Sequence, residues 1–121
     1  MHELSVALSL IELAVEKAGE IGGGRVEAVH LRLGRLAGVA KDALAFSFDL
    51  ASGGTPVDGA RLVIEEVPVM VFCPECRAER AANEAGGLRC SVCGTLARDV
   101  TRGRELELTA LEVSEDVPSH R

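Results

Sequence analysis

The residues most able to do chemistry in this chain are four cysteines in its second half, arranged in two C-x-x-C pairs. The pairs read Cys73-Pro74-Glu75-Cys76 and Cys90-Ser91-Val92-Cys93. Cysteines two residues apart can both turn toward one ion, and two such pairs offer four sulfurs to a tetrahedral Zn²⁺. Gly86, Gly87 and Gly94 beside the second pair allow the turns that this requires. The spacing therefore predicts a zinc site on Cys73, Cys76, Cys90 and Cys93.

A zinc ion held by four cysteines has no open position for water, so we expect this site to stabilise the protein and not to catalyse. Two other interpretations remain open from the spacing alone. The same four cysteines could hold an iron–sulfur cluster, and a single pair such as Cys73 and Cys76 could do thiol redox chemistry as an oxidoreductase.

A second candidate metal site lies at the amino end, where the chain begins Met1-His2-Glu3. The α-amine, the imidazole of His2 and the backbone nitrogens between them can form fused chelate rings around one ion. Nitrogen ligands in a plane favour Ni(II) or Cu(II). An ordinary exposed histidine is the alternative. Two sites of different softness in one small chain indicate metal handling and no enzyme activity.

Composition argues against a nucleic-acid partner. Only 2% of the 121 residues are aromatic, so platforms on which bases could stack are missing. The formal net charge is -6 and the sequence pI is about 5.0, which opposes a phosphate backbone. Basic protein surfaces or cations are the better partners.

We expect a cytoplasmic protein with no membrane segment. The amino end lacks the pattern of a secretory signal, and no run of apolar residues is long enough to span a bilayer. In a reducing compartment, cysteines in C-x-x-C pairs bind metal more often than they form disulfides.

Hydrophobic periodicity predicts an α+β fold in which two helices cover a three-stranded sheet. The helices are expected at residues 3–18 and 40–51, and the strands at residues 25–33, 61–72 and 105–113. The face of the first helix that should be buried carries Leu4, Ala7, Leu8, Ile11, Ala14, Val15 and Ala18. Pro68 suggests an edge or a bulge within the third range.

Because strands lie on both sides of the cysteine segment, we interpret that segment as an insertion and not a tail. Residues 1–70 and 101–118 should form the nickel-binding α+β domain, and residues 71–100 the inserted zinc module.

Other polar residues are weaker candidates. His30 lies on the polar face of its predicted strand and His120 near the carboxyl end, and neither is assigned to a site. Six arginines lie in or near the cysteine segment, where local charge balance and a docking surface remain equally good interpretations: Arg77, Arg80, Arg89, Arg98, Arg102 and Arg104. The acidic pairs, Glu65 with Glu66 and Glu12 with Glu16, lack a catalytic partner and indicate solvated faces.

Taken together, several motifs resemble one family. They are Met1-His2-Glu3-Leu4-Ser5, the run from Leu31 to Val39 (LRLGRLAGV), Gly54-Thr55-Pro56 and Gly103-Arg104-Glu105-Leu106, in order around the two cysteine pairs. Over roughly residues 1 to 113 the chain is similar to the hydrogenase nickel-incorporation chaperones of the HypA/HybF family.

The resemblance implies Ni(II) as transferred cargo and Zn(II) as a structural ion on the four cysteines. It implies nickel ligands from Met1, His2 and Glu3, namely the amine, the imidazole and backbone nitrogen of His2, and the backbone nitrogen of Glu3. The Glu3 carboxylate could equally cap the first helix. Implied partners are a hydrogenase-maturation GTPase and the hydrogenase large-subunit precursor, with urease as another destination and the chaperone a monomer or homodimer. The competing hypothesis is a zinc-ribbon adaptor between proteins, in which His2 is incidental.

Overall fold

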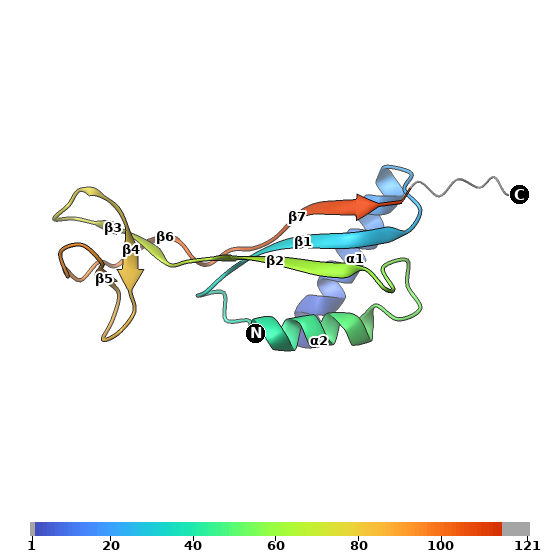
Figure 1. Ribbon diagram of the computed structural model, residues 1–121, viewed down its shortest axis with the longest axis horizontal. Coiled ribbons are helices and arrows are strands. Elements are labelled where there is room, and N and C mark those ends of the chain that lie inside the picture. Colours follow the sequence, from blue (N-terminus) through green and yellow to red (C-terminus); the bar gives the residue numbers. More distant parts are fainter. Residues whose placement is uncertain (1, 115–121) are drawn as a thin grey trace, which may run out of the picture. The chain divides into compact units, whose positions relative to one another are not determined.

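Two helices and seven strands make up residues 2–114, the part of the chain that this computed structural model describes (Figure 1). In chain order they are α1 (Glu3–Glu20), β1 (Val26–Gly34), α2 (Lys41–Ala51), β2 (Arg61–Val67), β3 (Met70–Cys73), β4 (Ala78–Asn83), β5 (Arg89–Cys90), β6 (Asp99–Arg102) and β7 (Leu106–Val113). One sheet has the order β2-β1-β7 and the other the order β5-β4-β3-β6. The predicted α+β class, with two helices and a three-stranded sheet, is confirmed.

The chain divides into two compact units. One comprises Met1–Leu31, Gly38–Glu65 and Glu107–Arg121, and the other comprises Arg32–Ala37 and Glu66–Leu106. The first unit contains both helices, and the second contains the four cysteines. Whether these units act as a nickel domain and a zinc module stays a prediction.

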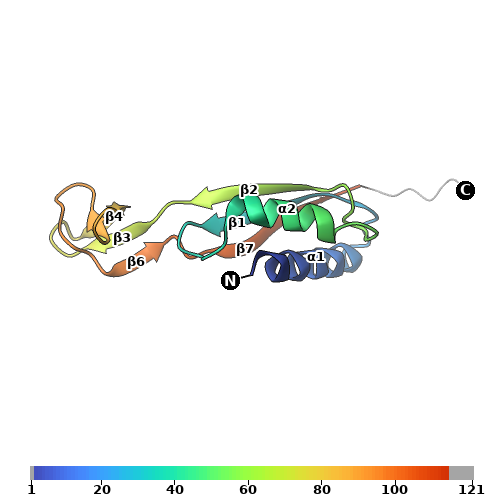
Figure 2. The ribbon, with the colours of Figure 1, turned by 90° about the horizontal axis from the view of Figure 1, so that it is seen from below.

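In the first unit, α1 and α2 pack against each other and cover the same face of the strands (Figure 2). The core is aliphatic, with the single aromatic Phe48 fully buried beside Leu44 of the same helix. On β1, Val29 and Leu31 are buried as their alternation predicts, whereas His30 between them is only half-buried. No helix among the described residues is long and apolar enough to cross a membrane.

The buried face of α1 differs from the predicted one. Leu4 and Leu8 are 46% and 51% exposed, whereas Val6 and Leu10 are buried. Apolar residues occupy more than half of the circumference of this helix, so two overlapping stripes both satisfy helical spacing. Packing against the sheet selects the stripe of Val6, Ala7, Leu10, Ile11, Ala14 and Ala18.

The predicted strand at residues 61–72 is two strands that belong to different sheets. β2 ends at Val67 and β3 begins at Met70, with Pro68 and Val69 between them. Proline has no N–H to donate to a neighbouring strand, so the sheet ladder is interrupted where Pro68 enters. The sequence predicts an edge or a bulge at Pro68, but it does not predict that the chain passes from one sheet to the other there.

Short antiparallel strands form the second unit. β3 pairs with β4 from Met70↔Ala81 to Cys73↔Ala78, and it pairs on its other side with β6. Its small core contains Val69, Val71 and Ala97, with three partly buried neighbours against it: Ala82, Leu88 and Val100. Of these strands, β4, β5 and β6 were not predicted; β4, for example, reads AERAAN and has little strand propensity of its own.

Close backbone contact near the end of β1 requires a glycine. A Cβ on Gly34 would lie 2.2 Å from the carbonyl carbon and oxygen of Gly103. The two segments are held there by hydrogen bonds from the N–H of Gly34 to the carbonyl of Glu105, 2.8 Å, and from the N–H of Leu36 to the carbonyl of Gly103, 2.6 Å. The approach therefore cannot widen without breaking these bonds.

We predict that Gly34→Ala lowers the free energy of unfolding by about 3 kcal/mol, because the added methyl group overlaps backbone that cannot easily move. Gly19→Ala is the matched control, since Gly19 lies inside α1 with nothing within 4 Å of an added Cβ. That change should stabilise the protein by about 0.5 kcal/mol, the usual advantage of alanine in a helix. Chemical denaturation measures both, and equal effects of the two substitutions would contradict the steric argument.

Candidate metal centres

The four cysteines meet at one point in the second unit. Their Sγ atoms all lie within 4.8 Å of one another, and they form the single cluster of at least three histidine, cysteine or acidic ligands found among the described residues. The Sγ–Sγ separations include 3.6 Å for Cys73–Cys93, 3.9 Å for Cys76–Cys90 and 3.8 Å for Cys76–Cys93. With Zn–S bonds of about 2.3 Å, a regular tetrahedron has S···S edges of about 3.8 Å. The donor set and its spacing fit a tetrahedral ion.

Both C-x-x-C pairs fold into the same tight turn. In the first, the N–H of Cys76 points to Sγ of Cys73 at 3.4 Å, and the N–H of Arg77 donates to the carbonyl of Cys73 at 2.7 Å. In the second, the N–H of Cys93 points to Sγ of Cys90 at 3.5 Å, and the N–H of Gly94 donates to the carbonyl of Cys90 at 2.9 Å. Backbone donors thus support one sulfur in each pair.

The residue that follows each pair has a left-handed backbone conformation. Gly94 has φ 80, which costs glycine little, but Arg77 has φ 55 and is the one described residue other than glycine with positive φ. Such a conformation is uncommon for a residue with a Cβ. The cysteine turn imposes it on Arg77.

Crowding of the thiols separates their pKa values. Hydrogen bonds from the side chain and then the backbone of Thr95 lower the pKa of the Cys93 thiol to about 6. The Arg80 guanidinium lowers the pKa of Cys76, but burial and hydrogen bonds with the other three cysteines outweigh it and raise that pKa to about 11. Four thiolates this close repel one another unless a cation lies between them, so the site favours binding a soft divalent ion.

The arginines near the cysteines have separate local roles. Arg80 has a raised pKa because its guanidinium hydrogen-bonds with Cys76 and lies near the negative charge of the thiols. Arg102 forms an ion pair with Glu79 at 3.5 Å, and Arg89 donates to the carbonyl of Gly94 at 3.2 Å. These contacts favour the interpretation of local charge balance and not that of a shared docking surface. The sequence indicated Arg80 only as one of six arginines near the cysteines and did not indicate Thr95, since only the folded cysteine segment brings these two residues to the sulfurs.

The amino end presents His2 at the start of α1. His2 is the N-cap residue, with φ -83 and ψ 119, and its carbonyl accepts from the N–H of Val6 at 3.1 Å. Its side chain makes no capping hydrogen bond and the residue is exposed. The backbone of His2 is therefore held by the helix while its imidazole faces solvent. Met1, which is also a predicted ligand residue, lies outside the described residues.

Glu3 connects the starts of the two helices. Its Oε2 accepts a hydrogen bond of 2.9 Å from the backbone N–H of Ala40, the N-cap residue of α2. That bond, followed by one from its own backbone N–H, holds the pKa of the Glu3 carboxyl below its ordinary value of 4.5. The carboxylate thus stabilises the helix that it begins and also reaches α2, which the sequence did not predict.

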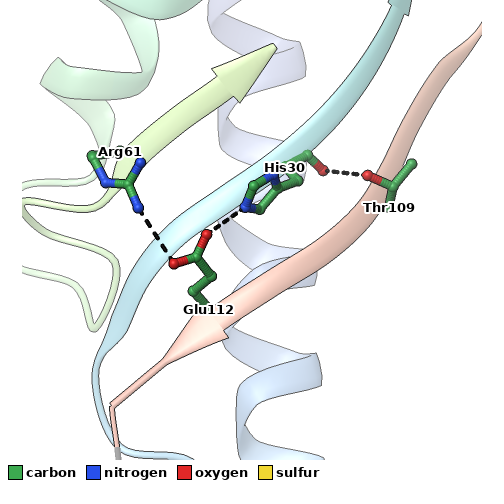
Figure 3. A network of polar contacts seen from close by, with 4 residues as sticks. All are labelled: His30, Arg61, Thr109 and Glu112. Atoms are coloured by element: carbon green, nitrogen blue, oxygen red, sulfur yellow. Dashed lines mark hydrogen bonds and ion pairs between the residues drawn. The ribbon is translucent and has the colours of Figure 1, made fainter. Parts of the chain in front are cut away.

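The remaining histidine within the described residues takes part in a polar network on the face of the sheet turned away from the helices (Figure 3). Nε2 of His30 lies 2.7 Å from Oε2 of Glu112, whose other oxygen accepts from Arg61 at 3.3 Å. The hydrogen bond with His30 and then the charge of Arg61 lower the pKa of Glu112. This histidine has a local partner, as its place on a polar face indicated. His120 lies outside the described residues.

Comparison with known proteins agrees with the resemblance seen in the sequence. A family model described as hydrogenase/urease nickel incorporation, metallochaperone, matches residues 1–113. A hydrogenase maturation factor HypA from Roseiflexus sp. strain RS-1 is 52% identical over 118 residues, covering 98% of this chain and 96% of that protein. A protein of the same description from Chloroflexus aurantiacus is 53% identical over 112 residues, covering 93% and 98%.

Solved structures agree with the sequence comparison. The solution structure of the Ni metallochaperone HypA from Helicobacter pylori superposes with a TM-score of 0.64 at 28% identity, covering 93% of this chain and 97% of that one. A second solution structure of a HypA protein gives a TM-score of 0.69 at 27% identity, covering 96% and 98%. From its matched length, its identity to these relatives and its fold, this chain belongs to the HypA family of hydrogenase/urease nickel-incorporation metallochaperones.

Proposed function

We propose that this protein binds Ni(II) at its amino terminus and delivers it during maturation of a [NiFe]-hydrogenase, while a structural Zn(II) holds the four cysteines together. The observation that carries the proposal is family membership across residues 1–113, joined to an exposed His2 directly in front of a helix. The protein acts as a carrier and not as an enzyme. A zinc-ribbon adaptor remains the competing function, and it would bind no nickel at His2.

The proposed nickel ligands are the α-amine of Met1, the imidazole and backbone nitrogen of His2, and the backbone nitrogen of Glu3. The first N–H groups of a helix have no carbonyl partner within the helix, so the nitrogen of Glu3 can ligate without breaking the α1 ladder. Nitrogen donors arranged in a plane are well suited to Ni(II). The Glu3 carboxylate, bonded to Ala40, supports this arrangement by fixing the start of α1.

A cargo ion must be exchangeable, and the two proposed sites differ in this respect. The cysteine site would enclose its ion with four thiolates, two of them on the buried residues Cys73 and Cys90, which suits a resident ion. His2 is exposed, so an acceptor can approach the nickel directly. Protonation of the amine and the imidazole would then release the ion.

The zinc assignment predicts that the purified protein contains one Zn²⁺ and that Cys73→Ser or Cys93→Ser loses it. Bound zinc supplies folding energy to a small unit, so hydrogen exchange at residues 73–93 should rise in these variants while α1 and α2 remain protected. Elemental analysis and amide hydrogen exchange provide the measurements. Ser91→Ala, between the two ligands of the second pair, is the control that should keep zinc. Iron in the purified protein, or full zinc content in a variant lacking all four cysteines, would rule out the assignment.

The nickel assignment predicts dependence on the exact amino terminus. Adding one glycine before Met1 converts its amine to an amide and moves His2 out of register, and His2→Ala removes the imidazole. Either change should abolish high-affinity Ni(II) binding measured by calorimetry and leave zinc in place, whereas His30→Ala should bind as the wild type does. Equal affinity in the extended protein would show that the amine is not a ligand, and His30 would become the next candidate.

The same site predicts a pH dependence. An α-amine titrates at about 7.7 to 8.0 in peptides, and both it and the imidazole must be unprotonated to ligate, so affinity should fall steeply from about pH 8 to pH 6. The Glu3 anchor should persist through this range. Its pKa is depressed, so its contribution is complete at neutral pH and is lost only as the pH falls below the ordinary value of 4.5. A nickel affinity that stays constant between pH 8 and pH 6 would contradict the nitrogen ligand set.

Delivery predicts a transient complex with a partner that takes up nickel. Nickel-loaded protein should transfer Ni(II) to the hydrogenase-maturation GTPase or the hydrogenase large-subunit precursor faster than free Ni(II) supplied at the same concentration. Pull-down and stopped-flow metal transfer test this, with the glycine-extended protein as the unloaded control. Transfer to a urease precursor but not to hydrogenase components would redirect the proposal to urease, and no acceleration with any of these partners would defeat it.

A further inference from the structure

We propose that the outward side of the α1–α2 helix pair is the docking surface for the protein that receives nickel, and that this partner presents an apolar surface surrounded by lysine and arginine. The inference rests on the proposed function above and identifies where the transient complex forms. We call this surface, marked by Leu4, Leu8, Phe46 and Leu50, the helix-pair surface.

Large apolar side chains are exposed on both helices. Phe46 and Leu50 lie one turn apart on α2 and are each 66% exposed. The buried residues of α2 are Leu44 and Phe48, both 0% exposed, so helical geometry directs Phe46 to the opposite, exposed side of the helix. Leu4 and Leu8 lie one turn apart on α1 and are 46% and 51% exposed. Polar residues at these four positions would leave the core intact, so the fold does not require apolar side chains there.

Acidic residues outnumber basic ones among the exposed ionisable residues close in sequence to these apolar positions, with Lys41 at the start of α2 as the basic exception on that helix. On α1, Glu12 and Glu16 follow Leu8 at successive turns. On α2, Asp42 lies one turn before Phe46, and Asp49 directly precedes Leu50. All four acids are exposed. On α1 the basic residue is Lys17, which pairs with Glu20 at 3.7 Å. An apolar surface with an acidic rim is complementary to an apolar surface with a basic rim.

This charge pattern favours a different protein over a second copy of the chain. Two copies joined through the same surface would bring four acids of one against four acids of the other. Like charges across an interface oppose association, and the formal charge of the whole chain, -6, adds to the repulsion. A basic partner would be attracted electrostatically to this surface, whereas a second copy would be repelled.

The helix-pair surface begins at the proposed nickel ligands. The Glu3 carboxylate binds the N–H of Ala40, so α1 and α2 start at the same end of the pair (Figure 2). Leu4 lies two residues after His2 at that end. A partner seated on Leu4 and Phe46 would therefore lie beside His2 and could accept the ion without leaving the complex.

Another concave region of the first unit does not combine these features. A hollow of about 340 Å³ between α1 and β7 is lined by Leu13, Lys17, Ile21 and Leu108 among others. Lys17 and Glu20 both border it, so it has no single sign of charge. Ile21, 67% exposed, thus provides an apolar residue of equal exposure outside the proposed surface.

The test compares Phe46→Ser/Leu50→Ser with Ile21→Ser as the matched control, each loaded with Ni(II) and titrated with the purified hydrogenase-maturation GTPase. Both variants should bind Ni(II) and unfold as the wild type does, because none of the substituted residues is buried or a proposed ligand. Loss of central apolar contacts should weaken GTPase binding by the double variant by about tenfold or more, against less than about twofold for Ile21→Ser. Asp42→Lys/Asp49→Lys should weaken it by about fivefold at low salt, and the deficit should shrink as salt screens the charges.

The outcomes separate this inference from the proposed function. If the wild type binds the GTPase and transfers nickel while Phe46→Ser/Leu50→Ser does the same unchanged, the helix-pair surface is wrong and the chaperone function stands. If sedimentation shows that the double substitution abolishes self-association and spares GTPase binding, the surface joins two copies and the inference is overturned. If the wild type neither binds nor transfers, both proposals fail.

Discussion

The convergence of four cysteine sulfurs, which repel one another once they are ionised to thiolates, is the constraint on which the second unit depends. These sulfur atoms lie within 4.8 Å of one another, on the last residues of β3 and β5 and on the turns that follow these short strands. The apolar core of the unit, centred on Val69, Val71 and Ala97, is too small to hold such a charge cluster together by itself. A divalent ion bound between the thiolates would convert the repulsion into attraction, so metal binding and folding would be coupled there.

The first unit depends on ordinary packing. The two helices bury Leu44, Phe48 and the stripe of α1, and at the described amino end the backbone is held by the Glu3–Ala40 hydrogen bond and by the bond from Val6 to the His2 carbonyl. These bonds matter because they fix the backbone from which His2 projects without engaging the imidazole. A cargo site needs this combination, since a rigid frame sets the ligand geometry while an exposed ligand allows exchange.

The sequence predicted most features that follow from local spacing. The two C-x-x-C pairs identified the cluster because their chemistry requires convergence, and α2 followed from Leu44 and Phe48 one turn apart. What could not be predicted depends on contacts between distant segments. The choice between two apolar stripes on α1 is made by the sheet, the strand AERAAN exists only because β3 and β5 pair with it, and the reach of Glu3 to Ala40 joins segments 37 residues apart.

The failed prediction for α1 carries the most functional information. Periodicity assigned Leu4 and Leu8 to the core, but the fold leaves them exposed to solvent, as it does Phe46 and Leu50 of α2. The chain has only three phenylalanines and no other aromatic residue, so an exposed phenylalanine on α2 is a feature that the core does not explain. Where hydrophobic patterning and burial disagree, the excess apolar surface has to be explained by something outside the folded chain. Here Leu4 lies two residues after His2, at the proposed nickel site, whose cargo would have to leave the protein.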